Sequence, residues 1–320
     1  MKKVLSVILG GCLVAAFAVF AGCSKGDSHK DLITGDFSAE ATAVQRTQLG
    51  EALSSDSLWG DQSQDGWKFS IENVVYGYMD IDAVAMGESM VIDTDMDVSH
   101  LITLEKKDGA LSLRGAGNMK MDMNMMGIQA SYSGKAYNDS DYYYLDATVS
   151  ALGQKQSVKQ KMYLSEAMGI DLDIDENDLI GSFADLTPIL ESLDDQLVKI
   201  YIDDSDEQEQ KVKIAWTADD FTQYFEDILN EDLGDMSGVS IDTGSLQVEN
   251  FGCCEYYVSL DKDTGILTGF GSKLDFTLGM SMLIDGTSVK YTFDYDLTSW
   301  VMQTEKEASL PSDLSGYEFA

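Results

Sequence analysis

Histidine and basic side chains are scarce in this chain of 320 residues. Its two histidines, His29 and His100, lie far apart in sequence and offer neither a His-rich zinc site nor much general-base chemistry. Lys and Arg number 21 against 56 acidic residues, which gives a formal net charge of −35. Such a surface repels nucleic acid and anionic lipid headgroups, so neither is expected as a binding partner.

Sequence motifs of common enzyme classes are also missing. The chain has no G-x-S-x-G nucleophile elbow, no phosphate-binding loop and no histidine pair with metal-ligand spacing. A glycosidase with two catalytic carboxylates remains an alternative. With 56 acidic residues in the chain, however, the presence of carboxylates alone does not favour it. We therefore expect a protein that is not an enzyme and that needs no cofactor.

The first residues have the pattern of a secretory signal peptide. Lys2 and Lys3 precede an apolar run from residue 4 to residue 20, which small residues follow at Ala21 and Gly22. No later apolar run is as long, so after cleavage the chain is expected to have no membrane span of its own.

The residues around the cut, Phe20-Ala21-Gly22-Cys23, resemble the lipobox of bacterial lipoproteins, which usually has Leu where this chain has Phe20. The resemblance implies cleavage before Cys23, acylation of its thiol with palmitate-type chains, and anchoring on the extracytoplasmic side of a bacterial membrane. Each buried methylene contributes about 0.8 kcal/mol, so two acyl chains give stable attachment. The alternative is an ordinary secretory signal with an incidental cysteine.

The chain divides into three parts by composition. Residues 1–22 form the signal peptide, residues 23–66 are mostly small and polar and are expected to form a flexible tether with a short helix over residues 39–53, and residues 67–320 form a single domain. The hydrophobic share of 44% with 10% aromatics is too high for a disordered acidic chain.

Alternation of apolar and polar residues predicts long strands with one wet and one buried face. It is clearest in residues 91–98, 118–125 and 266–297. The segment 267–284 would span on the order of 60 Å if straight, so it must bend, and Gly269, Gly271 and Gly279 supply places for bulges. We expect an α+β, mainly β fold: a curved antiparallel sheet, an open half-barrel of roughly ten strands, with one or two amphipathic helices on the concave face.

Two segments have helical spacing. Thr217 and Asp220 form a capping-box-like start, and the apolar stripe that follows them reaches Gly234. A weaker amphipathic helix is expected over residues 177–193, interrupted by Pro188.

This order of elements behind a lipobox resembles LolA and the LppX-like lipoproteins over most of residues 67–320. LolA itself is not lipid-anchored. The resemblance rests on architecture, and it implies an open half-barrel whose concavity holds helices and a lipophilic ligand.

A stripe of methionines on one predicted strand face is the strongest candidate site. Thioethers favour Cu(I), but no His or Cys joins the stripe, so core or ligand-cavity lining is favoured over a copper site. The apolar side chains of the hairpin over residues 266–297 should lie on the same face of the sheet as these methionines. The predicted cavity-lining residues are Met119, Met121, Met123, Phe276, Leu278, Met280, Phe293, Tyr295, Phe225, Ile228 and Leu229.

Other clusters lack the pattern of a site. Asp171, Asp173 and Asp175 begin like an EF-hand loop, but the required Gly and Glu are absent. The alternating Asp residues of segment 91–98 fit a solvated strand face, with a weak surface Ca²⁺ site as the alternative.

The only cysteines expected outside the signal and the anchor are Cys253 and Cys254, neighbours that point to opposite faces of a strand. We expect Cys254 in the core. The thiolate of Cys253 should be disfavoured by nearby carboxylates, which argues against a catalytic nucleophile.

The sequence therefore favours a surface lipoprotein, joined to the membrane by its Cys23 lipid, that binds a lipid or other hydrophobic ligand as a carrier or a sensor. The alternative is a non-catalytic interaction or structural lipoprotein whose concave face is filled by its own helices. A carboxylate-based hydrolase is a distant third.

We expect Cys23→Ala to release the protein into the medium or periplasm in uncleaved or otherwise unlipidated form, because no other segment is apolar enough to hold it. Fractionation of cells in high salt measures this. Persistent membrane binding of the variant would contradict the anchor.

Overall fold

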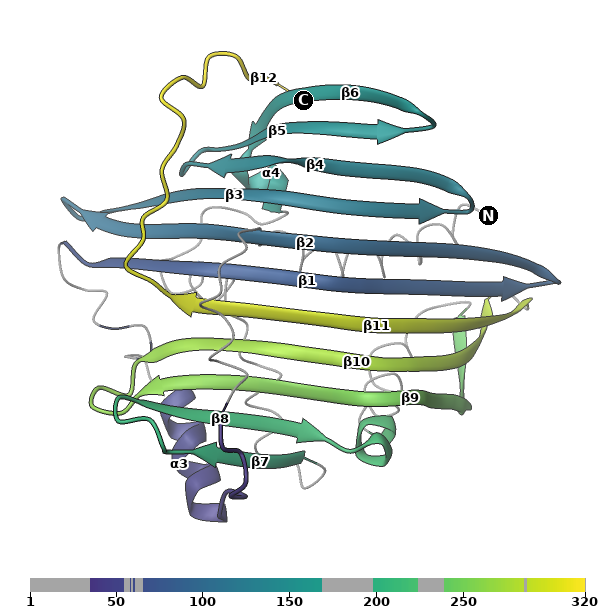
Figure 1. Cartoon of the computed structure of the whole chain (residues 1–320), viewed down its shortest axis with the longest axis horizontal. Coiled ribbons are helices and arrows are strands. Elements are labelled where there is room, and N and C mark those ends of the chain that lie inside the picture. Colours follow the sequence, from purple (N-terminus) through teal and green to yellow (C-terminus); the bar gives the residue numbers. More distant parts are fainter. Residues whose placement is uncertain are drawn as a thin grey trace.

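The computed structural model describes residues 35–54, 58, 60, 66–168, 198–223, 239–284 and 287–319, which form one open sheet with short helices against it (Figure 1). The order across the twelve-stranded sheet is β12-β6-β5-β4-β3-β2-β1-β11-β10-β9-β8-β7. The described elements in chain order are α3 (Ala43–Leu53), β1 (Lys68–Ala85), β2 (Glu88–Lys107), β3 (Ala110–Met125), β4 (Ile128–Asn138), β5 (Tyr142–Ala151), β6 (Gln154–Tyr163), α4 (Leu164–Met168), β7 (Val198–Asp203), β8 (Glu209–Trp216), β9 (Val239–Asp261), β10 (Leu267–Ile284), β11 (Thr287–Gln303) and β12 (Glu318–Phe319).

Two runs of antiparallel strands meet in the middle of the sheet. β1 to β6 follow each other in space as in sequence, β7 to β11 do the same, and β1 pairs with β11 to join the two runs. The short β12 pairs with β6 in parallel. The mainly β, open architecture is confirmed, whereas the expectation of a purely antiparallel sheet is wrong at this one pair.

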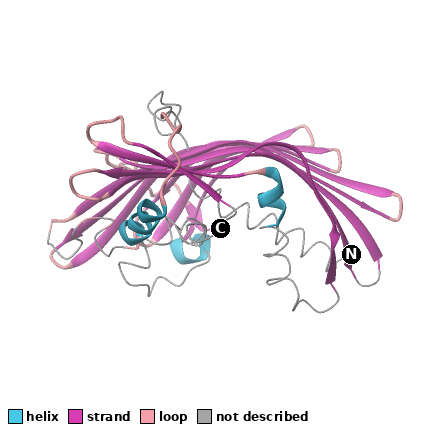
Figure 2. Ribbon diagram, turned by 90° about the horizontal axis from the view of Figure 1, so that it is seen from below, coloured by secondary structure: helices cyan, strands magenta, loops and turns pink. Residues whose placement is uncertain are grey.

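The sheet is strongly curved, and the helices lie on its concave side (Figure 2). The pairing of β10 with β9 shifts register between Leu267 and Gly269, between Asp275 and Thr277, and between Gly279 and Ser281. Two of these irregularities fall at glycines that the sequence marked as bulge positions. Bulges increase local twist and bend, which lets such long strands follow the curve.

The concave face is apolar because the alternation along each strand places one side chain in two on it. A main core cluster covers β7 to β11 and the adjoining end of β1, with Val212, Val258 and Leu278 nearly inaccessible. A second cluster, around Phe69, Leu104 and Leu164 of α4, covers the start of β1, the end of β2 and the start of β3. The core therefore lies between the arch and the helices beneath it.

Segments near both chain ends cover the edges of the sheet. At the β7 edge, Ala41 N donates to Ile200 O (2.7 Å) and Ile202 N donates to Ala39 O (3.1 Å). At the other edge, β12 covers part of β6. Open strand edges are templates for unwanted pairing, and both are shortened in this way.

The helix α3 confirms the predicted short helix but packs on the sheet. Thr42 and Gln45 form a capping box at its start, and Leu49 and Leu53 are each only 4% exposed. Residues 35–54, which the sequence places within the tether, thus contact the domain.

The predicted helix start at Thr217 is confirmed. Asp220 N donates to Thr217 Oγ1 (3.3 Å), and residues 218–223 are helical. The rest of that helix, the predicted helix over residues 177–193 and Cys23 all lie outside the described residues.

Candidate functional site

The predicted lining residues from the two halves of the chain share the concave face. Met119 lies opposite Val98 on the neighbouring strand, and Tyr295 lies opposite Met79 on one side and Phe276 on the other. Strand register therefore confirms the expectation that the methionine stripe and the apolar side chains of the terminal hairpin lie on the same face of the sheet. Phe225, Ile228 and Leu229 lie outside the described residues.

The β10–β11 half of this face is packed. Phe276, Leu278 and Met280 are only 5%, 1% and 6% exposed. The ring of Phe221, in the helix that follows β8, lies with its centroid 4.7 Å from that of Phe276. Tyr295 adds a second ring at 5.2 Å. Side chains of the protein itself thus fill this half.

The β3–β5 half is more open. Met119 packs at the edge of a small cluster with Val75, Met96 and Val98. Further along β3, Met121 is half-buried and Met123 is 38% exposed. The strands beyond it carry smaller or partly exposed apolar side chains, so the face here presents adaptable thioethers to whatever lies in the concavity.

The open half also contains a tyrosine, Tyr132, whose phenol has a raised pKa. This β4 residue lies opposite Met121 of β3 on one side and opposite Val149 of β5 on the other. Burial raises its pKa to about 12. The phenol therefore stays neutral at physiological pH and can donate one hydrogen bond in an apolar setting.

Tyr291 shares the face in the packed half, as the alternation of the terminal strand predicts, although it is not among the predicted cavity-lining residues. Tyr291 is 4% exposed, and its hydroxyl has no hydrogen-bond partner among the described residues. Burial raises its pKa.

The convex face carries an acidic band, built from aspartates that lie directly opposite each other across strands. Asp80 of β1 faces Asp93 on one side and Asp294 on the other. Asp95 faces Asp122, and Asp275 faces Asp296. Like charges directly opposite each other destabilise a sheet.

The clearest effect of the band is on Asp80. Burial, followed by repulsion from Asp93 and less strongly from Asp294, raises the pKa of Asp80 above its ordinary value, against a hydrogen bond from the Thr94 backbone. The ionised form of this carboxyl is therefore disfavoured in the folded protein.

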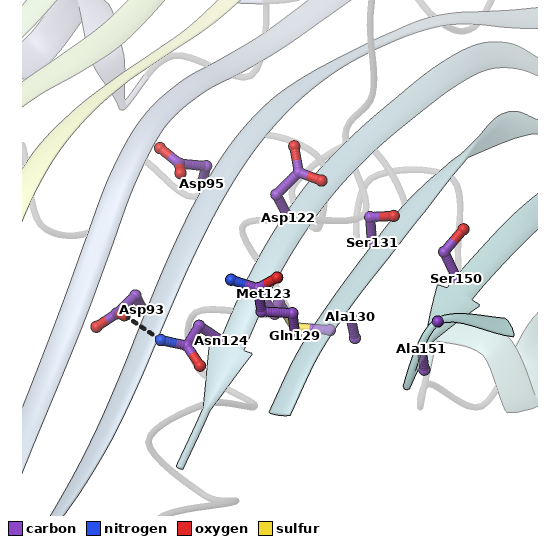
Figure 3. A pocket seen from close by; sticks show the side chains of 11 residues that line it. Asp93, Asp95, Asp122, Met123, Asn124, Gln129, Ala130, Ser131, Ser150 and Ala151 are labelled. Atoms are coloured by element: carbon purple, nitrogen blue, oxygen red, sulfur yellow. Dashed lines mark hydrogen bonds between the residues drawn. The ribbon is translucent and has the colours of Figure 1, made fainter. Parts of the chain in front are cut away.

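A depression of about 570 Å³ lies at the β2–β5 end of this band (Figure 3). Its polar lining includes Asp93, Asp95 and Asp122, and the Asn124 amide donates to Asp93 Oδ2 (2.8 Å). Within the described residues, no three His, Cys, Asp or Glu side chains are placed to hold a metal ion.

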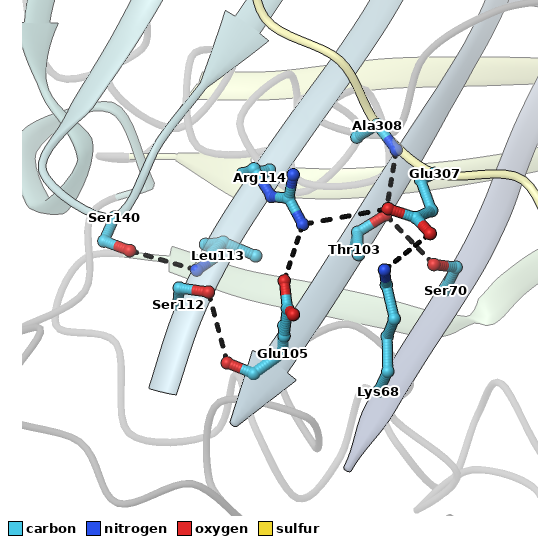
Figure 4. Close-up of polar contacts among 10 residues, drawn as sticks. All are labelled: Lys68, Ser70, Thr103, Glu105, Ser112, Leu113, Arg114, Ser140, Glu307 and Ala308. Atoms are coloured by element: carbon cyan, nitrogen blue, oxygen red, sulfur yellow. Dashed lines mark hydrogen bonds and ion pairs between the residues drawn. The ribbon is translucent and has the colours of Figure 1, made fainter. Parts of the chain in front are cut away.

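A C-terminal strap, residues 304–319, crosses the same convex face (Figure 4). Ala308 N donates to the buried Thr103 Oγ1 (2.9 Å), which lies 3.0 Å from Ser70 Oγ. Lys306 forms an ion pair with the nearly inaccessible Glu72 (2.8 Å). A hollow of about 480 Å³ remains between strap and sheet. The strap thus covers the polar side of strands β1 to β3.

The two described cysteines are both free thiols. Cys254 is 4% exposed in the main core cluster, which confirms its expected core position. Burial, with the Glu255 carboxylate, raises the pKa of Cys253 to about 11. This agrees with the expectation that its thiolate is disfavoured.

Comparison with known proteins gives little. No family model and no curated protein matches the chain. The translocator domain of autotransporter NalP from Neisseria meningitidis is 7% identical with a TM-score of 0.19, over 82% of this chain and 95% of that chain. A DUF1329 family protein from Desulfovibrio piger is 10% identical with a TM-score of 0.14, over 85% of this chain and 92% of that chain. Scores this low support no argument about fold or function. Of the helices described, none has the length and apolar character needed to cross a membrane.

The two halves of the concave face should respond oppositely to added volume. We expect Leu278→Trp to overpack the filled half and lower the free energy of unfolding by about 1 to 3 kcal/mol. Met121→Trp in the open half should change it by less than about 0.5 kcal/mol. Urea titration of both variants measures this, and equal destabilisation would show that both halves are packed.

The acidic band should make stability depend on pH at Asp80. Because its folded pKa is raised, ionised Asp80 costs stability above that pKa, and the cost disappears as the pH falls toward the unfolded value. Asp80→Asn should therefore stabilise the protein at pH 7 by up to about 1 kcal/mol, with a smaller gain at lower pH. Denaturant midpoints across pH test this. The control is Asp82→Asn, on the same strand and face opposite the uncharged Val91 and Thr292, where an equal gain would contradict cross-strand repulsion.

Proposed function

We propose that this chain is an extracytoplasmic lipoprotein that binds a lipid or another hydrophobic ligand on the concave face of its sheet. One observation carries the proposal: a continuous apolar face is packed by the protein's own side chains over one half, whereas the methionine half stays partly exposed. Soluble proteins seldom leave a large apolar area uncovered unless something binds it.

The proposed ligand region centres on Met119, Met121 and Met123. Unbranched thioether side chains adapt to ligands of different shape, which suits acyl chains of variable length. Tyr132 adds one neutral hydroxyl beside them, which suits an ester or hydroxyl group at the polar end of such a ligand. The described residues that β3, β4 and β5 place on this half of the concave face include no carboxylate.

The proposed anchor is the acylated Cys23. Gly35, where the described structure begins, lies twelve positions after it. A fully extended chain reaches at most about 3.5 Å per residue, so the lipid lies within about 40 Å of Gly35. The packing of residues 35–54 on the domain makes this link shorter than the tether expected from sequence, and the domain is held near the membrane.

A structural or interaction lipoprotein is the second candidate. The packed half favours it, because Phe221, Leu49 and Leu53 already fill the concavity over β7 to β11. The two candidates differ in the open half, where the first requires a bound ligand and the second requires none.

Native mass spectrometry of the full chain, purified from membranes in mild detergent, tests the proposal. We expect a co-purified adduct of lipid mass, and binding of the fluorescent probe N-phenyl-1-naphthylamine once that adduct is removed. Met121→Gln with Met123→Gln should weaken probe binding by about tenfold, equivalent to about 1.4 kcal/mol. Lys120→Gln, on the same strand with its side chain on the opposite face, is the matched control. Absence of both adduct and probe binding in the wild type would rule out the carrier and favour the second candidate.

A further inference from the structure

Three hairpin turns at one end of the sheet expose a large apolar side chain. Met86 joins β1 to β2, Met126 joins β3 to β4, and Leu152 joins β5 to β6, with exposed fractions of 86%, 61% and 77%. Figure 1 shows all three turns at the same end of the strands. We call these three residues the apolar tip row.

The turns themselves do not require apolar residues. Met86, Met126 and Leu152 all have left-handed backbone, with φ of 54°, 53° and 52°, and a glycine follows each. Asn, Asp and Gly are the residues that tight hairpins favour in this conformation, whereas bulky residues are uncommon there. The chain therefore places exposed apolar side chains where both solvation and backbone preference oppose them.

The opposite end of the sheet provides an internal comparison. The turn between β2 and β3 has the same geometry, with φ of 53° at its first residue, but that residue is Asp108. The other turns at that end carry Asp141, Asp206 and Asp263. The same fold thus has an acidic end, with ordinary turn residues, and an apolar end.

Neighbouring residues extend the apolar end. Val84, Met125 and Ile128, which flank the turns, are 43%, 51% and 47% exposed, and Leu283 near the end of β10 is 46% exposed. Residues 84–89, 125–129 and 150–155 contain only two charged residues, Glu88 and Lys155. Successive tips are two strands apart across the sheet, about 10 Å each, and they are also staggered along the strands. Met126 N donates to Val91 O, so Met126 lies about four residues, on the order of 13 Å, behind Met86. Leu152 lies about two residues, on the order of 7 Å, behind Met126, so the row runs obliquely to the strands.

We propose that the apolar tip row inserts into the interfacial region of a lipid bilayer. Isolated protruding side chains more than about 10 Å apart suit a fluid surface that closes around each one, with the strands inclined so that the oblique row meets it. A protein partner instead needs a continuous complementary patch. The scarcity of charge at these turns, in a protein of net charge −35, removes the repulsion that the rest of the surface would experience near phosphate headgroups.

The reach of the N-terminal link agrees with this placement, in an argument that rests on the proposed Cys23 lipid. Phe37 packs against the cluster of Val74, Tyr257 and Trp300. Val74 lies twelve residues before Met86, about 40 Å along β1. The link from Cys23 to Gly35 spans at most about the same length. Lipid and tips therefore reach one membrane when the link is extended or the strands are inclined to the surface.

Brominated-lipid quenching of tryptophan fluorescence tests the proposal on the full lipidated chain, reconstituted in phosphatidylcholine vesicles. Met126→Trp places a fluorophore at the apolar end, and Asp108→Trp places one in the matched turn at the acidic end. After subtraction of the wild-type signal, we expect the added fluorescence to be quenched at least threefold more strongly at position 126. Equal quenching at the two positions would overturn the proposal.

Replacing the other tips tests the row as a unit. Met86→Asn with Leu152→Asn, in the Met126→Trp background, should lower the quenching at position 126 by at least half. The melting temperature should stay the same or rise, because Asn suits left-handed turn positions. Met126→Trp quenching that does not change would refute a joint insertion. A blue shift that grows with protein concentration but is not quenched by lipid would assign the row to a second copy of the chain and overturn the proposal.

The outcome is separable from that of the ligand experiment. Loss of tip quenching leaves the co-purified lipid adduct untouched if only the insertion proposal is wrong. Absence of the adduct together with strong quenching at position 126 would contradict the proposed ligand binding and support insertion of the apolar tip row.

Discussion

An open sheet with one apolar face imposes the constraint on which the rest of this structure depends. Alternation along twelve strands brings about half of the side chains to the concave side, where they must be covered, and it leaves two strand edges that must be protected. α3 and the Phe221 segment cover part of the face, while residues 39–41 and β12 protect the edges. Both ends of the described chain are thus used to finish a sheet that does not close on itself.

The convex face, in contrast, stays hydrated, and the aspartates that keep it so lower the stability of the sheet because they lie directly opposite each other. Asp80 lies between Asp93 and Asp294 with no intervening basic residue in the register, although the strand pairing would accommodate a lysine. The strap nearby is held differently, through the buried Thr103 hydroxyl and the Lys306–Glu72 pair. The band therefore adds negative charge rather than stability, and it keeps one whole face of the sheet strongly hydrated.

The alternation and capping patterns in the sequence were enough to predict features that are determined within a single strand or helix start. They located the strand over residues 267–284, two of its bulges, the core position of Cys254 and the helix start at Thr217, because each of these follows from alternation or capping within a few residues. They could not give the pairing of β1 with β11, the parallel β12 or the strap, since these contacts join residues more than 150 positions apart in sequence. For the same reason they placed Leu278 and Met121 in one cavity, whereas the division into packed and open halves is set by which distant segment covers each.

The tip row and the open half of the concave face are continuous, which gives them a common physical meaning. Met125 and Ile128 pair at the end of the β3–β4 hairpin directly behind Met126, and Met123, Met121 and Met119 follow at alternate positions on the concave side. An acyl chain entering at the tips would pass along thioether side chains without crossing the acidic convex surface, so its transfer would not require exposure to water. A route through the other end would pass Asp108 and its acidic neighbours. If the tip row inserts into a membrane as proposed, the asymmetry between the two ends of the sheet gives the concave face a direction, inward from the methionine end.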